Sequence, residues 1–477
     1  MRTKLSTFDA FADSLFPHEL DYLVNIQQFR KQVNLDILRR MQANSNTLTK
    51  KAYDTAIDKR SYSYVKNWVE ENLARIDVDV YFNWLIETER NVLTDVIAPS
   101  EEAEILSNLK QITPVHYYFI RFYELLQYYR DYLTVRNRTR YSSIVLQYLD
   151  TYETDFSKAV EVNRQLDRIT AQIVKKENLA DETLNLEYEN QLKSVFFDES
   201  LDGYTRYRSI VRLTIYYYNM REFAKQAAIY DHVDDLFRTP LFYSRRIMAN
   251  YYANRAMMHN KLNQLDEAEK FGYLSIRSKN SDYLFYLINL CGILLKQKKN
   301  KEALAIMRQA IPELKKTNNN YYKIGFVSFY LRSLMANNKH RQALDYANEY
   351  FESYKNMIFE HRWHLFFTAY FEVLINREKF SKIITLSRRY NLIALEKQRL
   401  DRADYLPVIQ CYVLTAEYFE NILNKEKYIS QLSSIIRDIL SDSYRSVKIP
   451  GILDELSRLL PDEIKALKKE LRQVDVS

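Results

Sequence analysis

Apolar residues recur along this chain every three or four positions, which is the spacing of one buried face of an α-helix. No segment shows the strict alternation of apolar and polar residues that is typical of a β-strand. Residues 8–29 predict one or two amphipathic helices interrupted near Pro17, residues 62–97 predict another pair, and residues 115–133 predict one long aromatic helix. We therefore expect an all-α fold.

Signals for helix starts agree with this pattern. Thr113-Pro114 and Thr239-Pro240 each place an N-cap hydroxyl before a proline at the first helical position, where the missing N–H costs nothing. Ser100 followed by two glutamates predicts a third start. Pro461 predicts the start of the last helix, and residues 452–474 predict an amphipathic helix that closes the chain.

A phrase recurs in the C-terminal half of the chain. It opens with a polar turn and then places a small or apolar residue where two helices would pack closely, as in LDEAEKFGYLSI from Leu265 and NKEALAIMRQAI from Asn300. The aligned positions, including a weaker copy from Arg221, are Ala224, Ala268, Ala303, Ala343 and Ile383, separated by 44, 35, 40 and 40 residues. A two-helix unit with this period is typical of an α-solenoid.

These residues resemble the tetratricopeptide repeat (TPR). Placing Ala268 at the small position of the second helix puts Ala256 at the small position of the first helix and Tyr252 at the bulky aromatic site. The resemblance is degenerate, because the unit around Ala343 has Leu331 at the small site and the spacings exceed the 34 residues of the family. It covers about half of the chain.

The repeat pattern suggests three regions. Residues 1–200 lack the phrase and predict an N-terminal helical region, which we expect to be a bundle leading into the solenoid; further divergent hairpins are the alternative. Residues 201–445 predict TPR-like helical repeats, and residues 446–477 a C-terminal capping helix, which an array needs to cover its last apolar face.

Composition excludes several classes of function. Among 477 residues only 5 are glycine, where average usage of about 7% would give some thirty. The isolated glycines exclude a P-loop and a dinucleotide fingerprint, both of which need two or three glycines within a few residues. Nucleophile-elbow motifs are absent as well. We expect no enzyme activity, no catalytic residues and no cofactor.

One histidine pair, His361 and His364, has metal-ligand spacing if both lie on one helix. Neither a cysteine nor an H-E-x-x-H order accompanies the pair, so we predict no metal site. Cys291 and Cys411 lie in apolar stretches and indicate core positions rather than a disulfide. The longest apolar stretch, residues 283–295, is too short to span a bilayer, and the first residues lack the apolar core of a signal peptide. We expect a cytoplasmic protein without a membrane segment.

Charge and tyrosine content point to possible partners. The net charge is +7, and basic clusters occur at residues 136–140, 206–212 and 296–301. Tyrosine is unusually frequent at 40 residues and forms five adjacent clusters, starting at Tyr117, Tyr128, Tyr216, Tyr251 and Tyr321. Neighbouring residues on a helix point about 100° apart, so at least one ring of each cluster should lie on a flank or in a groove. Packing between hairpins is the commoner role for large rings, and a binding groove is the alternative.

If the TPR resemblance holds, it implies an inner groove lined by the first helix of each hairpin. Carried onto this chain, that groove comprises Arg206, Ser209, Tyr216, Asn250, Ala253, Met257, Asn260, Ser328, Arg332, Met335, Thr368 and Glu372. Amides and guanidinium groups of this kind suit an extended peptide. We therefore predict a non-enzymatic scaffold that binds a protein or peptide as an adaptor, sensor or regulatory subunit. The alternative is a helical-repeat protein that binds nucleic acid through its basic clusters and tyrosines.

Overall fold

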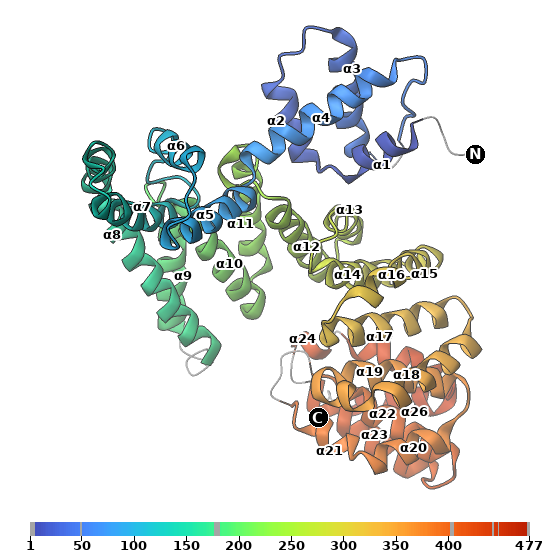
Figure 1. The fold of residues 1–477 in the computed structure, drawn as a ribbon. Helices are drawn as coiled ribbons and strands as arrows, with labels where there is room; N and C mark the ends of the chain where they lie inside the picture. The colour runs from blue at the N-terminus through green and yellow to red at the C-terminus, as the bar shows by residue number, and fades with distance from the viewer. Residues whose placement is uncertain are drawn as a thin grey trace. The chain divides into compact units, whose positions relative to one another are not determined.

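The computed structural model of the chain describes residues 5–47, 50–175, 182–400, 405–440, 443–446 and 448–474. Over these ranges the fold is all-helical and contains no β-strand, which confirms the all-α part of the predicted fold (Figure 1). Contacts between residues divide the chain into two compact units, residues 1–280 and residues 281–477. The predicted boundaries at residues 200 and 445 follow the repeat pattern and stay predictions.

Unit 1 begins with four helices that pack on one another, as the predicted break near Pro17 and the pair over residues 62–97 suggested (Figure 1). In the described part of unit 1 they are followed by nine α-helices and a single turn of 3₁₀-helix, η1 (Pro240–Phe242). The α-helices of unit 1 are α1 (Ser6–Ser14), α2 (Pro17–Ile26), α3 (Gln32–Ser45), α4 (Lys59–Ile76), α5 (Val78–Leu93), α6 (Pro99–Asn108), α7 (Phe119–Val135), α8 (Thr139–Lys175), α9 (Glu182–Phe197), α10 (Gly203–Met220), α11 (Phe223–Leu236), α12 (Arg245–Lys261) and α13 (Leu265–Ser275).

Buried polar bonds tie the start of the chain to α12 and α13. The Glu19 side chain is fully buried; it accepts hydrogen bonds from the Phe16 N–H and the Tyr243 hydroxyl, each at 2.7 Å, and lies 3.3 Å from the Arg245 guanidinium. Burial raises the pKa of this carboxyl, and the charge of Arg245 opposes that rise. Arg277 donates to the carbonyl oxygens of Leu15 and Ser45. Segments more than 220 residues apart in sequence therefore share one polar core.

Unit 2 consists of helical hairpins and a C-terminal pair. The first helices of the successive hairpins pack side by side in chain order; they are α14, α17, α19 and α22. The second helices, α15, α18, α20 and α23, each pack against the first helix of their own hairpin (Figure 1). The helices are α14 (Tyr283–Lys296), α15 (Asn300–Gln309), α16 (Ile311–Lys316), α17 (Asn320–Ala336), α18 (His340–His361), α19 (Trp363–Asn376), α20 (Phe380–Arg389), α21 (Leu392–Lys397), α22 (Val408–Phe419), α23 (Lys425–Leu440), α24 (Ser443–Ser446), α25 (Ile449–Ser457) and α26 (Pro461–Val474).

Each repeat phrase follows the same left-handed turn. The first helix of the hairpin ends at a residue with φ between 53° and 63°, and the N–H of the next residue donates to the carbonyl five positions earlier at 2.9 Å. This is the hydrogen bond of a Schellman cap, which satisfies carbonyl groups left unpaired at a helix end. The capping residues of the five phrases are Arg221, Asn263, Lys298, Asn338 and Glu378. Glycine usually occupies this position, so its replacement here accounts for part of the low glycine content.

The turns also correct one aligned position. The side chain five residues after the left-handed residue lies on the second helix of the hairpin and faces the first helix. In four copies this residue is fully buried: Ala268, Ala303, Ala343 and Ile383. In the weakest copy this position is Gln226, which is buried and donates to the Thr214 carbonyl oxygen at 3.2 Å. The predicted Ala224 is exposed. The alignment of that copy was wrong by two residues because the left-handed turn falls at Arg221.

Replacing Lys298 by glycine is expected to stabilise unit 2. Lys298 is exposed and has φ 60°, a conformation that costs an L-residue about 1–2 kcal/mol, whereas glycine adopts it freely. After glycine's larger entropy loss, Lys298→Gly should raise the free energy of unfolding by about 0.5–1 kcal/mol, measured by urea titration. Glu302→Gly, exposed within α15, is the matched control and should lower it by about 1 kcal/mol. A loss of stability in Lys298→Gly would contradict the role of this turn.

Three predicted helix boundaries differ from the structure. Thr113-Pro114 begins no helix, because turns continue to Tyr118 and α7 starts at Phe119. Thr239-Pro240 begins only the 3₁₀ turn η1. The closing segment is two helices, α25 and α26, with the second beginning at Pro461 as expected. Near Ser100 the helix starts at Pro99, where Glu101 accepts the Ala98 N–H at 2.7 Å.

The tyrosine clusters are mostly part of the core. In three clusters one ring lies at least partly outside the core, as the 100° angle between neighbouring helical residues predicts: Tyr128 and Tyr321 are exposed and Tyr218 is half-buried. The neighbouring tyrosine of each is buried or half-buried. In the other two clusters both rings are buried. For example, Tyr252 packs against Phe16 with ring centroids 5.2 Å apart, while Tyr251 packs against Phe237 at 5.0 Å. The prediction of one outward ring was wrong in these two clusters. Tyr117 and Tyr118 lie in turns before α7, where the helical spacing of 100° does not apply, and α12 is covered on two sides.

Candidate functional site

A groove in unit 2 has the size and chemistry of a binding site. Its volume is about 560 Å³, within the range of about 300–1,000 Å³ that is common for ligand sites. Helices α16 and α17 form one wall and α18 forms the other. The lining residues are Ile311, Leu314, Lys315, Lys323, Tyr330, Tyr346, Glu349, Tyr350, Ser353, Tyr354 and Met357.

Four tyrosines form a continuous row along this groove. Tyr330 meets Tyr346 edge-on at a centroid distance of 5.3 Å, Tyr346 lies 6.4 Å from Tyr350, and Tyr350 lies 4.8 Å from Tyr354. Three of these rings belong to α18 and recur every four residues, so they share one face of that helix. The row ends at Tyr354, which is 49% exposed. An aromatic surface therefore runs from the interior of unit 2 to solvent.

The backbone of α18 bends at the exposed end of the row. Tyr354 has φ −132° and ψ 21°, which are not helical values, and the helix resumes after it. Tyr354 is therefore the point where the direction of the helix changes, beside the open end of the groove.

Charged groups surround the tyrosine row on both walls. Lys315 and Lys323 stand on the α16–α17 side, and Glu349 stands on α18. Burial raises the pKa of Tyr346 to about 12, and the neighbouring Tyr330 adds to the rise. The Tyr350 hydroxyl is buried without a hydrogen-bond partner, and burial raises its pKa as well. Both phenols are thus neutral at physiological pH and can act as hydrogen-bond donors.

The twelve residues predicted from the TPR resemblance do not all reach the surface. Arg206, Ser209, Tyr216, Ala253, Ser328, Met335 and Thr368 are buried, whereas Asn250, Met257, Asn260, Arg332 and Glu372 are partly exposed. In this conformation only the latter five could contact a partner. The structure brings two of them together, since Arg332 Nε lies 3.5 Å from a Glu372 carboxylate oxygen.

The face that carries this ion pair is occupied by the chain's own C-terminal helix α25. Glu455 of α25 accepts a hydrogen bond from the Tyr412 hydroxyl of α22 at 2.7 Å. Burial and the nearby charge of Glu372 raise the pKa of Glu455 to about 7. Within unit 2 the predicted first-helix groove is therefore partly filled, while the tyrosine groove on α16–α18 stays open.

In the first two basic clusters of the sequence, several arginines bond to other groups of the chain. Arg136 lies 2.9 Å from Asp95, and Arg138 pairs with Glu102. Arg206 is buried and donates to the Phe196 carbonyl oxygen at 3.0 Å. These residues do not form an open basic stripe of the kind that follows a nucleic-acid backbone.

The histidine pair lies on two helices rather than one. Helix α18 ends at His361 and α19 begins at Trp363, because Arg362 between them has φ −134° and ψ 43°. His364 Nε2 lies 2.9 Å from Glu396, whose carboxylate also accepts the N–H groups at the start of α22. Among the described residues no group of three or more His, Cys, Asp or Glu side chains could hold a metal ion.

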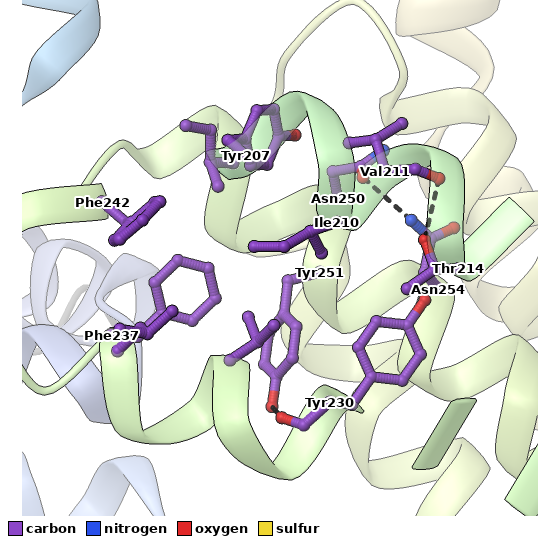
Figure 2. Close-up of a pocket in the computed structure, with 13 residues that line it drawn as sticks. Tyr207, Ile210, Val211, Thr214, Tyr230, Phe237, Phe242, Asn250, Tyr251 and Asn254 are labelled. Carbon is purple, nitrogen blue, oxygen red and sulfur yellow. Dashed lines mark hydrogen bonds between the residues drawn. The ribbon is translucent and has the colours of Figure 1, made fainter. Parts of the chain in front are cut away.

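A second pocket, in unit 1, is nearly closed (Figure 2). It lies between α10, α11, η1 and α12, and its volume of about 30 Å³ is that of about one water molecule. Figure 2 shows mostly apolar and aromatic side chains around it, with Asn254 donating to Asn250 at 2.9 Å on one side. The predicted groove residue Asn250 thus borders a small packing defect.

No family model matches this chain, and no curated protein or solved structure matches it significantly. No described helix is both long and apolar enough to cross a membrane. The repeats, the TPR resemblance and the groove must therefore be judged on the residues of this chain alone.

The sequence contained a signal for the tyrosine groove, which was missed because only tyrosines adjacent in sequence were considered. Tyr346, Tyr350 and Tyr354 recur every fourth residue, which predicts a shared helix face. Only the packing of α18 against α17 decides that this face borders a groove, with Tyr330 of α17 at its inner end.

Proposed function

We propose that this chain is a non-enzymatic helical-repeat protein of the cytoplasm whose hairpins form a TPR-like α-solenoid, and that it binds a peptide segment of another protein in the tyrosine groove of unit 2. As an adaptor, sensor or regulatory subunit, it would act through this contact. The observation that carries the proposal is the row of four tyrosines in an open groove of about 560 Å³.

The chemistry of the groove favours a particular kind of peptide. Tyrosine offers a large contact area at a small cost in rotamer entropy, which is why it is enriched at binding sites. Apolar side chains of Ile311, Leu314 and Met357 would hold an apolar anchor of the peptide. Lys315 and Lys323 would attract carboxylates beside that anchor. We therefore expect a segment with one or two large apolar residues flanked by Asp or Glu.

Selection from a random peptide library on the purified full-length protein tests this proposal. Selected peptides should share an apolar anchor with acidic neighbours. Their affinity, measured by fluorescence anisotropy, should fall at least tenfold in Tyr354→Ala and also fall in Lys323→Glu. Tyr128→Ala removes a similarly exposed tyrosine in unit 1 and should bind as the wild type does.

Two results would contradict the proposal. One is that no peptide is enriched over an unrelated helical protein. The other is that enriched peptides bind Tyr354→Ala and Lys323→Glu as tightly as the wild type, which would place their site elsewhere.

A further inference from the structure

A second open cavity, in unit 1, is lined by arginines and aromatic rings. Its volume is about 460 Å³, and no acidic side chain is among its nine lining residues. They come from α5, the start of α7, one face of α10 and the first turn of α12. The residues are Phe82, Tyr118, Arg121, Tyr204, Tyr207, Arg208, Val211, Arg212 and Arg246. We call this cavity the arginine pocket.

The aromatic wall of the arginine pocket is a short stack of rings. Phe82 and Tyr118 are stacked with centroids 4.8 Å apart and planes 27° apart, and Tyr204 follows Tyr118 at 5.6 Å and 33°. Tyr118 in the middle is buried, whereas Tyr204 at one end is 39% exposed. The Arg208 guanidinium lies over the Tyr204 ring, 5.9 Å from its centroid, so another flat ring would stack on the part of Tyr204 that stays exposed, as nucleobases do on aromatic side chains.

Each arginine of the cationic wall pairs with a carboxylate: Arg121 with Glu89 and Glu124, and Arg246 with Asp79. The two arginines of α10 share a single carboxylate. Arg208 and Arg212, one helical turn apart on α10, both bond to the same oxygen of Asp167 on α8. Asp167 is 61% exposed, whereas the two arginine side chains are only 21% and 16% exposed. Burial lowers the pKa of Arg212, and the like charge of Arg208 lowers it further. Two partly buried cations thus share one solvated anion.

The guanidinium groups also keep unused hydrogen-bond donors. Each carries five N–H bonds. Arg208 donates to Asn163 and Asp167, and Arg246 donates to the two oxygens of Asp79 at 3.0 and 2.8 Å. Both therefore retain donors beyond these bonds. Planar donors of this kind match the oxygens of a phosphate group.

Tyr207 and Val211 line both the arginine pocket and the small pocket between α10, α11 and α12 that Figure 2 shows.

We infer that the arginine pocket binds a nucleoside phosphate, with the phosphate held by Arg208, Arg212 and Arg246 and the base stacked on Tyr204. The cavity volume suits one small molecule of this class. A nucleic-acid strand would need further cationic side chains along a path, and Arg136, Arg138 and Arg206 are engaged elsewhere in unit 1. This site is independent of the tyrosine groove.

Calorimetric titration of the full-length protein with AMP, and separately with inorganic phosphate and with adenosine, tests the inference. AMP should bind at least tenfold more tightly than either fragment, since it alone engages both walls. Arg208→Gln combined with Arg212→Gln should weaken AMP binding at least tenfold. Arg130→Gln, an arginine of α7 outside the pocket, should leave it unchanged.

Arg208 and Arg212 also join α10 to α8, so their double variant could unfold. Tyr204→Ala removes the ring over which Arg208 lies but none of the arginines' hydrogen bonds to Asn163, Asp79 or Asp167, so it should weaken AMP binding several-fold while phosphate binding stays the same. Absence of AMP binding to the wild type at millimolar concentration would overturn the inference. So would phosphate binding as tightly as AMP, or AMP binding unaffected by Tyr204→Ala.

Discussion

Replacing Glu19 by alanine is expected to lower the free energy of unfolding of unit 1 by about 3–5 kcal/mol, the cost of breaking a buried ion pair from one side. The buried Tyr243 hydroxyl and the Phe16 N–H would each lose their acceptor, and Arg245 would lose its nearest carboxylate. Urea titration followed by circular dichroism gives the size of the loss, and hydrogen exchange in α12 localises it.

Two variants separate the contributions at this site. Glu19→Gln keeps an acceptor oxygen but removes the charge, so its loss should be smaller than that of Glu19→Ala. Glu87→Ala removes a glutamate that is 68% exposed and should change stability by less than about 0.5 kcal/mol. If Glu19→Ala were as stable as Glu87→Ala, the polar core between the start of the chain and α12 would not hold unit 1 together.

Replacing Phe367 by alanine should have a similar effect on unit 2. Phe367 of α19 is fully buried, and its ring lies 5.5 Å from Phe351 and 5.4 Å from Phe359 of α18. It also lies 6.5 Å from Tyr390, after α20, so one side chain connects three helical segments. Loss of such a ring costs about 3–5 kcal/mol, because the surrounding structure closes the cavity only in part.

The measurement for Phe367→Ala is urea unfolding together with hydrogen exchange in α18, α19 and α20. Phe419→Ala is the control. This ring is 36% exposed, and apart from the adjacent Tyr418 it packs against one aromatic ring among the described residues, that of Phe380. Its loss should be less than half as large. Equal losses in the two variants would show that the aromatic cluster around Phe367 is not the centre of unit 2.

The helical units could be predicted because their signals are local. The break at Pro17, the pairing of helices over residues 62–97 and the repeat positions Ala268, Ala303 and Ala343 depend on residues a few positions apart. Predictions failed where a local signal was incomplete. Thr113-Pro114 has the capping residues, but the following segment continues in turns to Tyr118, where Tyr117 accepts the Tyr204 N–H from α10 at 2.9 Å.

The candidate sites were harder to predict because they join distant segments. Arg208 and Arg212 were recognised as basic residues, but their pocket depends on Phe82 and Arg246, which are more than 120 residues and more than 30 residues away in sequence. Arg206, two positions earlier, points into the core instead. Residue type alone could not separate these arginines, since all three lie on the same helix.

Periodicity and composition were enough to predict that this chain is all-helical and poor in the glycines that nucleotide-cradling loops require. These properties follow from periodicity and composition, which act over single helices and turns. Tertiary structure alone decided which tyrosines border a groove, which arginines face a cavity, and that α25 meets the face bearing Arg332 and Glu372. Those outcomes depend on which helix faces pack together, because burial of one face leaves another open to solvent or to a ligand.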